Sequence, residues 1–228
     1  MPSAGVHFYL ANRLGKKGLD RDKFFLGNLL PDMEHVMRPR EELKISPLHW
    51  GSEHWERKRL LESFKDKSIR EGIKMHFLVD DYVHYHYVLP KIKKFRKKGR
   101  SEVIHYLTEI VMDGVLGKKD KKTVEFFEGF RKRIDVEKYG KELEKAFPKS
   151  KHSGKRVLRV NLEVLRLKNY TSFWRMNKVK KIIVKYNPFK EAEPSNLRLF
   201  YLILLLKREI KKDLSEFLKK AEKELRKK

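Results

Sequence analysis

Apolar residues recur along most of the chain at intervals of three and four, the period of one face of an α-helix. Leu158, Leu162 and Leu165 follow this spacing, and so do Leu199 and Ile203. With its capping and stop residues, the pattern predicts helices over these ranges: 3–14, a short stretch from 23, 56–66, 69–89, 101–112, 121–133, 156–168, 178–185 and 194–227. The sequence therefore predicts an all-α protein.

The predicted helix boundaries depend on a few residues. Ser3, Asp22 and Ser101 are predicted N-caps, because their side-chain oxygens accept hydrogen bonds from the first backbone N–H groups of a helix. Pro90 and Gly114 are the predicted ends of the helices that precede them.

Two kinds of segment depart from a simple helical pattern. Residues 156–167 also alternate partly between apolar and polar positions, so a strand is a second interpretation there. The basic, loop-like stretches 117–122 and 148–156 are predicted hinges.

Composition narrows the classes of protein that this chain resembles. Its 228 residues suffice for a hydrophobic core, and the absence of cysteine excludes disulfides, thiolate metal ligands and a cysteine nucleophile. No apolar run approaches the roughly 20 residues of a membrane span. The N-terminus shows no secretory signal pattern, so a cytoplasmic location is expected. The lack of glutamine and the 38% charged residues are typical of thermophile proteins.

The formal net charge of +25 predicts anionic partners, namely phosphate esters, nucleic acid or an anionic membrane surface. The charge is uneven: residues 1–110 carry +7 and residues 111–228 carry +18, whereas eight of the nine histidines lie in the first 105 residues. We therefore expect a histidine-rich, metal-binding helical core over 1–115 and a basic helical region over 116–228, packed together as one domain.

Histidines and carboxylates on an apolar segment are the strongest chemical pattern. His76, Asp80 and His84 are four residues apart, so a helix places them along one face. Burying a carboxylate on that face costs several kcal/mol. A divalent cation removes this cost, because the carboxylate and neutral imidazoles become its ligands. A buried His–Asp hydrogen bond without metal is the second interpretation. Further histidines and an acid beside apolar stretches favour the metal: His7, Asp32, His49 and His54.

His105 and Glu109, also four residues apart, form a second candidate pair. They are equally consistent with a solvent-exposed polar stripe on an amphipathic helix. His84 and His86 cannot both face one site on a regular helix. His35 is either a ligand or a loop residue, and His152, in a basic loop, is expected to be exposed.

Four of these elements occur in a recognisable order. They are His7, Gly27-Asn28-Leu29-Leu30-Pro31-Asp32, Leu48-His49-Trp50, and Gly72-Ile73-Lys74-Met75-His76-Phe77-Leu78-Val79-Asp80. The ordered set, over about residues 7–86, resembles the zinc-dependent phospholipase C family and, more distantly, the single-strand-specific zinc nucleases that share its multi-helical fold. In the secreted family members a processed N-terminal Trp supplies its amine as a ligand, and this chain lacks that Trp.

The resemblance implies a helical bundle, here with an additional basic C-terminal half, that holds one to three Zn²⁺ ions; Mn²⁺ and Fe²⁺ suit the same ligands. It implies that one ion is held by Asp32, His49, His76 and Asp80. Asp80 would bridge to a second ion at His7, and a third would take His84 or His86 with His105 and Glu109. The implied activity is phosphoester hydrolysis by metal-activated water, with Asp32 positioning the water.

Residues 91–100 carry seven basic side chains. Contacts to a phosphate backbone are expected from Lys93, Lys94, Arg96 and Lys97. Unpaired bases could stack on Phe95, Tyr170, Phe173 and Trp174. The alternative to an enzyme is thus a nucleic-acid-binding helical protein whose metal is structural or vestigial. A solvated basic face with core aromatics, and a last helix lying on an anionic membrane, are further interpretations.

Overall fold

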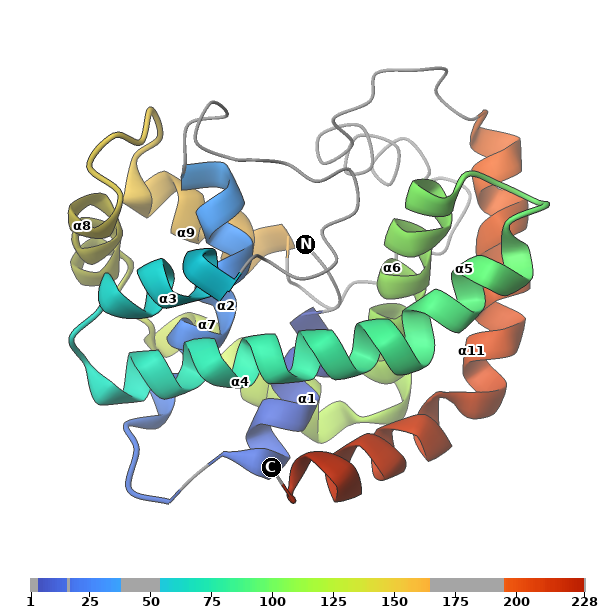
Figure 1. Cartoon of the computed structure of the whole chain (residues 1–228), viewed down its shortest axis with the longest axis horizontal. Helices are drawn as coiled ribbons and strands as arrows, with labels where there is room; N and C mark the ends of the chain where they lie inside the picture. Colours follow the sequence, from blue (N-terminus) through green and yellow to red (C-terminus); the bar gives the residue numbers. More distant parts are fainter. Residues whose placement is uncertain (1–3, 16, 38–53, 165–194, 228) are drawn as a thin grey trace. The chain divides into compact units, whose positions relative to one another are not determined.

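The computed structural model describes residues 4–15, 17–37, 54–164 and 195–227, and these form an all-α structure without strands (Figure 1). Its α-helices and one π-helical turn are α1 (Ala4–Leu14), α2 (Arg21–Met37), α3 (His54–Glu62), α4 (Lys67–Val83), η2 (His84–Val88), α5 (Leu89–Phe95), α6 (Ser101–Lys119), α7 (Lys121–Arg133), α8 (Val136–Ala146), α9 (Gly154–Val164) and α11 (Asn196–Leu225). None of these described helices combines the length and apolar character needed to cross a membrane. The all-α prediction is confirmed.

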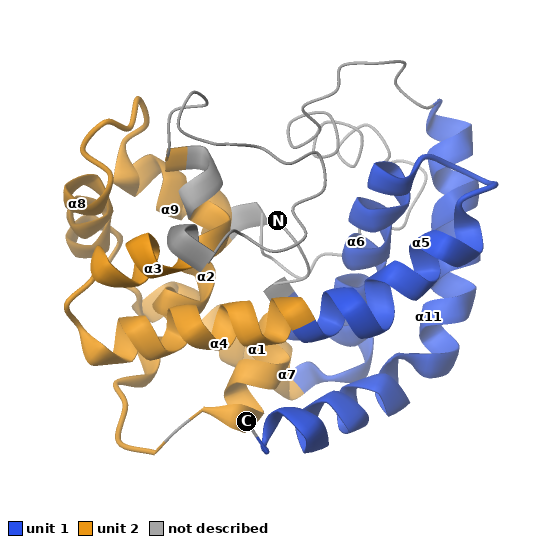
Figure 2. Cartoon of the chain, in the orientation of Figure 1, with its two compact units in different colours: residues 1–6, 82–121, 167–228 blue, residues 7–81, 122–166 orange. Residues whose placement is uncertain are grey.

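The chain forms two compact units, each built from separated stretches of sequence (Figure 2). Unit 1 comprises residues 1–6, 82–121 and 167–228, and unit 2 comprises residues 7–81 and 122–166. These units and the predicted regions 1–115 and 116–228 are therefore different divisions of the chain.

An aromatic cluster fills the core of unit 2. The Phe8 ring of α1 stacks on Phe25 of α2 with centroids 4.9 Å apart, and it meets Phe127 of α7 edge-on at 4.8 Å. Phe130, one turn later on α7, lies 5.5 Å from Phe8. All four side chains are fully buried, so this cluster joins α1, α2 and α7.

Helices α2 and α4 of unit 2 touch backbone to backbone at two glycines. A Cβ added to Gly27 would lie 2.1 Å from the carbonyl oxygen of Ile69, and one added to Gly72 would lie 2.0 Å from that of Phe24. Real side chains do not approach so closely, so only glycine permits this crossing. The amide of Asn28 donates to the Gly72 carbonyl at 3.4 Å across the same contact.

In unit 1, α11 packs on α6 through an apolar face that includes Leu199, Leu206 and Ile210. A second face of α11 carries acids that bind side chains of the segment η2–α5. Asp213 accepts hydrogen bonds from Tyr87 and Lys91, and Glu209 pairs with Lys94. These contacts fix η2 and α5 along α11.

Two predicted helix ends were wrong. The helix expected to stop at Pro90 continues as the π-helical turn η2 and then as α5, because buried residues on both sides of the proline, Val88 and Ile92, favour the helical path. Helix α6 runs through Gly114 to Lys119, since the buried residues Val115 and Leu116 extend its apolar face beyond the glycine.

Helix α2 is longer than the short helix predicted from Lys23. It spans seventeen residues with Pro31 inside, and its buried apolar side chains outweigh the hydrogen bond that the proline removes. Its cap is Asp20, which accepts from the Lys23 N–H at 3.1 Å, whereas Asp22 pairs with Arg133 at 2.8 and 3.0 Å. The prediction of Asp22 as the cap was therefore wrong.

The sequence pattern missed α8, and the strand interpretation of 156–167 is wrong over the described part, which is helix α9. Helix α8 begins where Asp135 accepts from the Lys138 N–H at 2.9 Å. The predicted helix 178–185 lies outside the described residues.

Candidate metal centres

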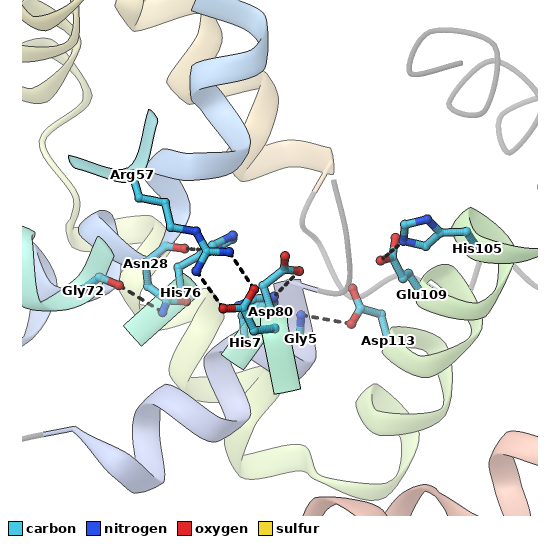
Figure 3. A network of polar contacts seen from close by, with 11 residues as sticks. Gly5, His7, Asn28, Arg57, Gly72, His76, Asp80, His105, Glu109 and Asp113 are labelled. Atoms are coloured by element: carbon cyan, nitrogen blue, oxygen red, sulfur yellow. Dashed lines mark hydrogen bonds and ion pairs between the residues drawn. The ribbon is translucent and has the colours of Figure 1, made fainter. Parts of the chain in front are cut away.

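The first candidate centre lies in unit 2 and consists of His7 from α1 with His76 and Asp80 from α4 (Figure 3). One ligand atom of each residue lies within 4.8 Å of the other two. The two imidazole rings stack with centroids 4.3 Å apart. Both histidines are buried, at 2% and 4% exposure, so α1 and α4 present two imidazoles and a carboxylate to one small volume.

A hydrogen bond at Nδ1 of His76 leaves Nε2 as the nitrogen that can bind a metal ion. Nδ1 lies 2.7 Å from the backbone carbonyl oxygen of Asn28, which only accepts, so Nδ1 carries the proton and Nε2 keeps its lone pair. Burial, with the neighbouring His7 adding to it, lowers the pKa of His76 to about 3, so the ring is neutral at pH 7. Metal-ligating histidines characteristically have such a carbonyl partner on the second nitrogen.

The glycine contact between α2 and α4 sets this geometry. Gly72 brings α4 against α2, and His76, one turn later, reaches the carbonyl of Asn28, the residue after Gly27. The motif Gly-x-x-x-His therefore has a physical reason: the glycine permits the helix contact, and the histidine one turn later uses it.

The distance between His7 and Asp80 agrees with shared ligation better than with a hydrogen bond. His7 Nε2 lies 3.8 Å from Asp80 Oδ1, too far for a hydrogen bond. Two ligands about 2.1 Å from one tetrahedral ion lie about 3.4 Å apart. The donor set of two imidazoles and a carboxylate fits zinc.

Sequence reasoning missed Arg57, which lies next to this centre. The Arg57 guanidinium of α3 forms two hydrogen bonds with Asp81, at 2.6 and 2.7 Å, and lies 4.8 Å from the centroid of the Phe77 ring (Figure 3). Asp81 directly follows Asp80, so a fixed positive charge stands beside the carboxylate ligand. No spacing in the sequence relates Arg57 to Asp81, because the contact joins two helices.

The second candidate centre lies in unit 1 and consists of His84 from η2 with His105 and Glu109 from α6. His105 Nε2 lies 2.7 Å from Glu109 Oε1, and the ring of His84 meets that of His105 edge-on at 4.6 Å. One turn further along α6, Asp113 accepts from the Gly5 N–H at 3.0 Å (Figure 3).

Burial of Glu109 argues against the solvent-exposed stripe. Its side chain is 3% exposed, and within the described part of the chain Oε2 has no hydrogen-bond partner. An unmatched carboxylate oxygen in the interior is costly, and a cation beside it offsets that cost. The residues present therefore fit a metal ion here as well.

The π-helical turn separates the two histidines of His84-Tyr85-His86. His84 is buried at 6% exposure, whereas His86 is exposed and its ring lies 4.5 Å from that of Tyr82. Only His84 thus joins the second centre. π-helical turns are frequent at functional sites.

The other predicted site residues either lie apart from the two candidate centres or fall outside the described residues. Asp32 is buried on α2, one turn after Asn28, but its carboxylate is in neither group of ligand atoms. His49 lies outside the described residues, as do the side chains of His35 and His54. His152 is exposed, as expected.

The basic segment after η2 is exposed at Lys93, Lys94, Arg96 and Lys97. Phe95 is buried at 7% exposure, so it belongs to the core and cannot stack on a base. The other three aromatic residues predicted to stack, Tyr170, Phe173 and Trp174, lie outside the described residues.

Comparison with known proteins gives no match: no family model, no curated protein and no solved structure is significantly similar to this chain. The resemblance to the zinc-dependent phospholipase C family therefore stays a prediction that rests on the motifs of this sequence.

Proposed function

We propose that this protein is a metal-dependent phosphoester hydrolase. The observation that carries the proposal is His76, a buried, neutral imidazole whose Nδ1–H is bound to the Asn28 carbonyl and which is grouped with His7 and Asp80. Burying two stacked imidazoles beside a half-buried carboxylate costs the two rings their contacts with water. A divalent cation offsets that cost.

The residues of the chain have distinct roles in this proposal. His7, His76 and Asp80 would hold one ion, and His84, His105 and Glu109 a second, with Zn²⁺ the ion that suits both donor sets. When bound, such ions supply a water of lowered pKa and positive charge for a phosphate oxygen. Asp32 is the carboxylate that we assign to positioning the attacking water, since it is buried one turn beyond Asn28 on α2.

Metal content tests the first centre. We expect the purified chain, loaded with Zn²⁺ and then gel-filtered, to retain at least one ion per chain by mass spectrometry. Asp80→Asn should lose that ion and melt at a lower temperature, because metal binding is coupled to folding. Asp81→Asn is the matched control: it removes the same charge from the next residue, whose partner is Arg57, and should keep the ion. Equal metal content in all three proteins would refute the assignment.

Turnover tests the chemistry. We expect hydrolysis of bis(p-nitrophenyl) phosphate that stops with a chelator and returns with Zn²⁺ or Mn²⁺. Asp32→Asn should reduce kcat while the metal content stays that of the wild type. Loss of metal in Asp32→Asn would make it a ligand instead, and the absence of chelator-sensitive turnover in the metal-loaded wild type would refute the hydrolase.

A second candidate function is nucleic-acid binding through the exposed residues Lys93, Arg96 and Lys97 of unit 1. Such binding is independent of base sequence and weakens steeply with salt. We expect the triple alanine variant to bind single-stranded RNA more weakly than the wild type and with a smaller salt dependence. No binding by the wild type at low salt would exclude this function.

A further inference from the structure

A cavity of about 290 Å³ lies between α6 and α11 within unit 1, and its lining begins little more than one turn of α6 after Glu109. Gly114, Val115, Lys118 and Lys119 line it from α6, and Lys207 and Lys211 line it from α11. Four of its six lining residues are lysines, and none is an acid. Gly114 and Val115, with the lysine methylenes, provide an apolar wall.

The acidic side chains Glu209 and Asp213 and the basic side chains Lys207 and Lys211 lie on different faces of α11. The acids Glu209 and Asp213 bind Lys94 and Lys91 of α5. Lys207 and Lys211, which are one turn apart, belong instead to the face that lines the cavity. Within the described residues, Lys118 and Lys211 form no ion pair with a carboxylate, so no acid neutralises these two charges there.

Helix capping explains only part of this arrangement. Lys118 and Lys119 lie in the last turn of α6, where cations interact favourably with the helix dipole. Lys119 also donates to the Lys211 carbonyl at 3.1 Å and to Ser215 at 3.3 Å, which fixes it across the two helices. The dipole does not explain why α11 adds two more lysines to the same cavity.

The pKa of Lys207 reflects the repulsion between these lysines. Burial lowers the pKa of Lys207, and the charges of Lys118 and Lys211 lower it further. A protein gains nothing in stability from such crowding, whereas an anion bound among the ammonium groups relieves it. Binding sites often carry this kind of strain in the free state.

We propose that this cavity binds a small anion with two or three phosphoryl groups. Several phosphoryl oxygens match several ammonium groups, and the volume suits a small molecule. The site lies on residues that take no part in the proposed hydrolysis, so it goes beyond that function.

Calorimetry with inorganic tripolyphosphate tests the site on the full chain after metal removal, so that the anion cannot bind through a metal ion. We expect one saturable site per chain whose affinity falls with added salt. Lys118→Ala/Lys211→Ala should weaken binding by at least about tenfold. Lys219→Ala/Lys223→Ala is the matched control: it removes two exposed lysines from α11 beyond the cavity and should bind like the wild type.

Lys207→Met, which keeps the methylene contacts of the half-buried lysine, is a second variant and should weaken binding without loss of helical circular dichroism. No saturable binding by the wild type, or an equal loss in the control variant, would overturn the proposal. Tight binding of single-stranded RNA without binding of tripolyphosphate would also overturn it and favour a nucleic-acid surface instead.

Discussion

Gly72→Ala directly tests the helix contact that positions His76. The added Cβ would lie 2.0 Å from the Phe24 carbonyl oxygen, and contacts under 3.0 Å essentially never occur. Helices α2 and α4 must therefore separate locally by about 1 Å, which forfeits a quarter to a half of the dispersion energy at the affected contacts. Overpacking of this kind costs about 3 kcal/mol. In a chain of this size that corresponds to a fall in melting temperature of about 6 to 12 °C.

Gly129→Ala is the matched control, because it makes the same change in α7 of the same unit. There the added Cβ would meet only the end of the flexible Arg133 side chain, at 3.0 Å. Alanine has the higher helix propensity, so this variant should gain about 0.5 to 1 kcal/mol. The assay is thermal and urea unfolding followed by circular dichroism, with zinc content measured in parallel. A Gly72→Ala protein that melts at or above the wild-type temperature with full zinc content would refute the reasoning.

Three further predictions follow from contacts in the two units. Glu109→Gln should lower the bound zinc by one ion and leave the ion of the first centre, as measured by mass spectrometry, and unchanged stoichiometry would contradict the second centre. Phe8→Ala should cost about 3 to 5 kcal/mol in urea unfolding, because its ring is fully buried among three others, whereas Tyr85→Ala, at 56% exposure, should cost almost nothing. Burial, with the hydrogen bond to Glu224, raises the pKa of Tyr82 to about 12, so its stabilisation is complete below pH 10 and is lost as pH rises towards 12. The stability difference between wild type and Tyr82→Phe should therefore shrink by about 1.4 kcal/mol per pH unit above 10, and a constant difference would contradict this.

The helical class could be predicted from the sequence because apolar spacing of three and four is a local signal. The same signal placed His76 and Asp80 on one face of a helix and His7 on a buried face, and the structure brings these three together. The four-residue spacing of His105 and Glu109 indicated a candidate pair, with a solvent-exposed stripe as an equal interpretation. In each case the prediction needed only the geometry of a single helix.

Features that depend on contacts between helices were not predictable in this way. The hydrogen bond from His76 to the Asn28 carbonyl involves backbone, which carries no sequence signature. The pairing of Arg57 with Asp81 joins residues of separate helices. The π-helical turn at His84 decides which of two histidines faces inward, and nothing in His84-Tyr85-His86 alone indicates an extra residue in that turn. Helix ends were missed at Pro90 and Gly114 because tertiary burial outweighed local propensity.

The interleaved units have a consequence for synthesis on the ribosome. Unit 2 is complete once residue 166 has been made, whereas unit 1 also needs residues 167–228. At about 5 to 20 residues per second, these 62 residues take about 3 to 12 s, longer than helices need to form. During that interval α6 has been made, but the face that α11 covers has no partner. The nascent chain thus exposes the part of α6 that α11 covers, while the aromatic core of unit 2 is already able to close, which makes α6 a segment for a chaperone to protect.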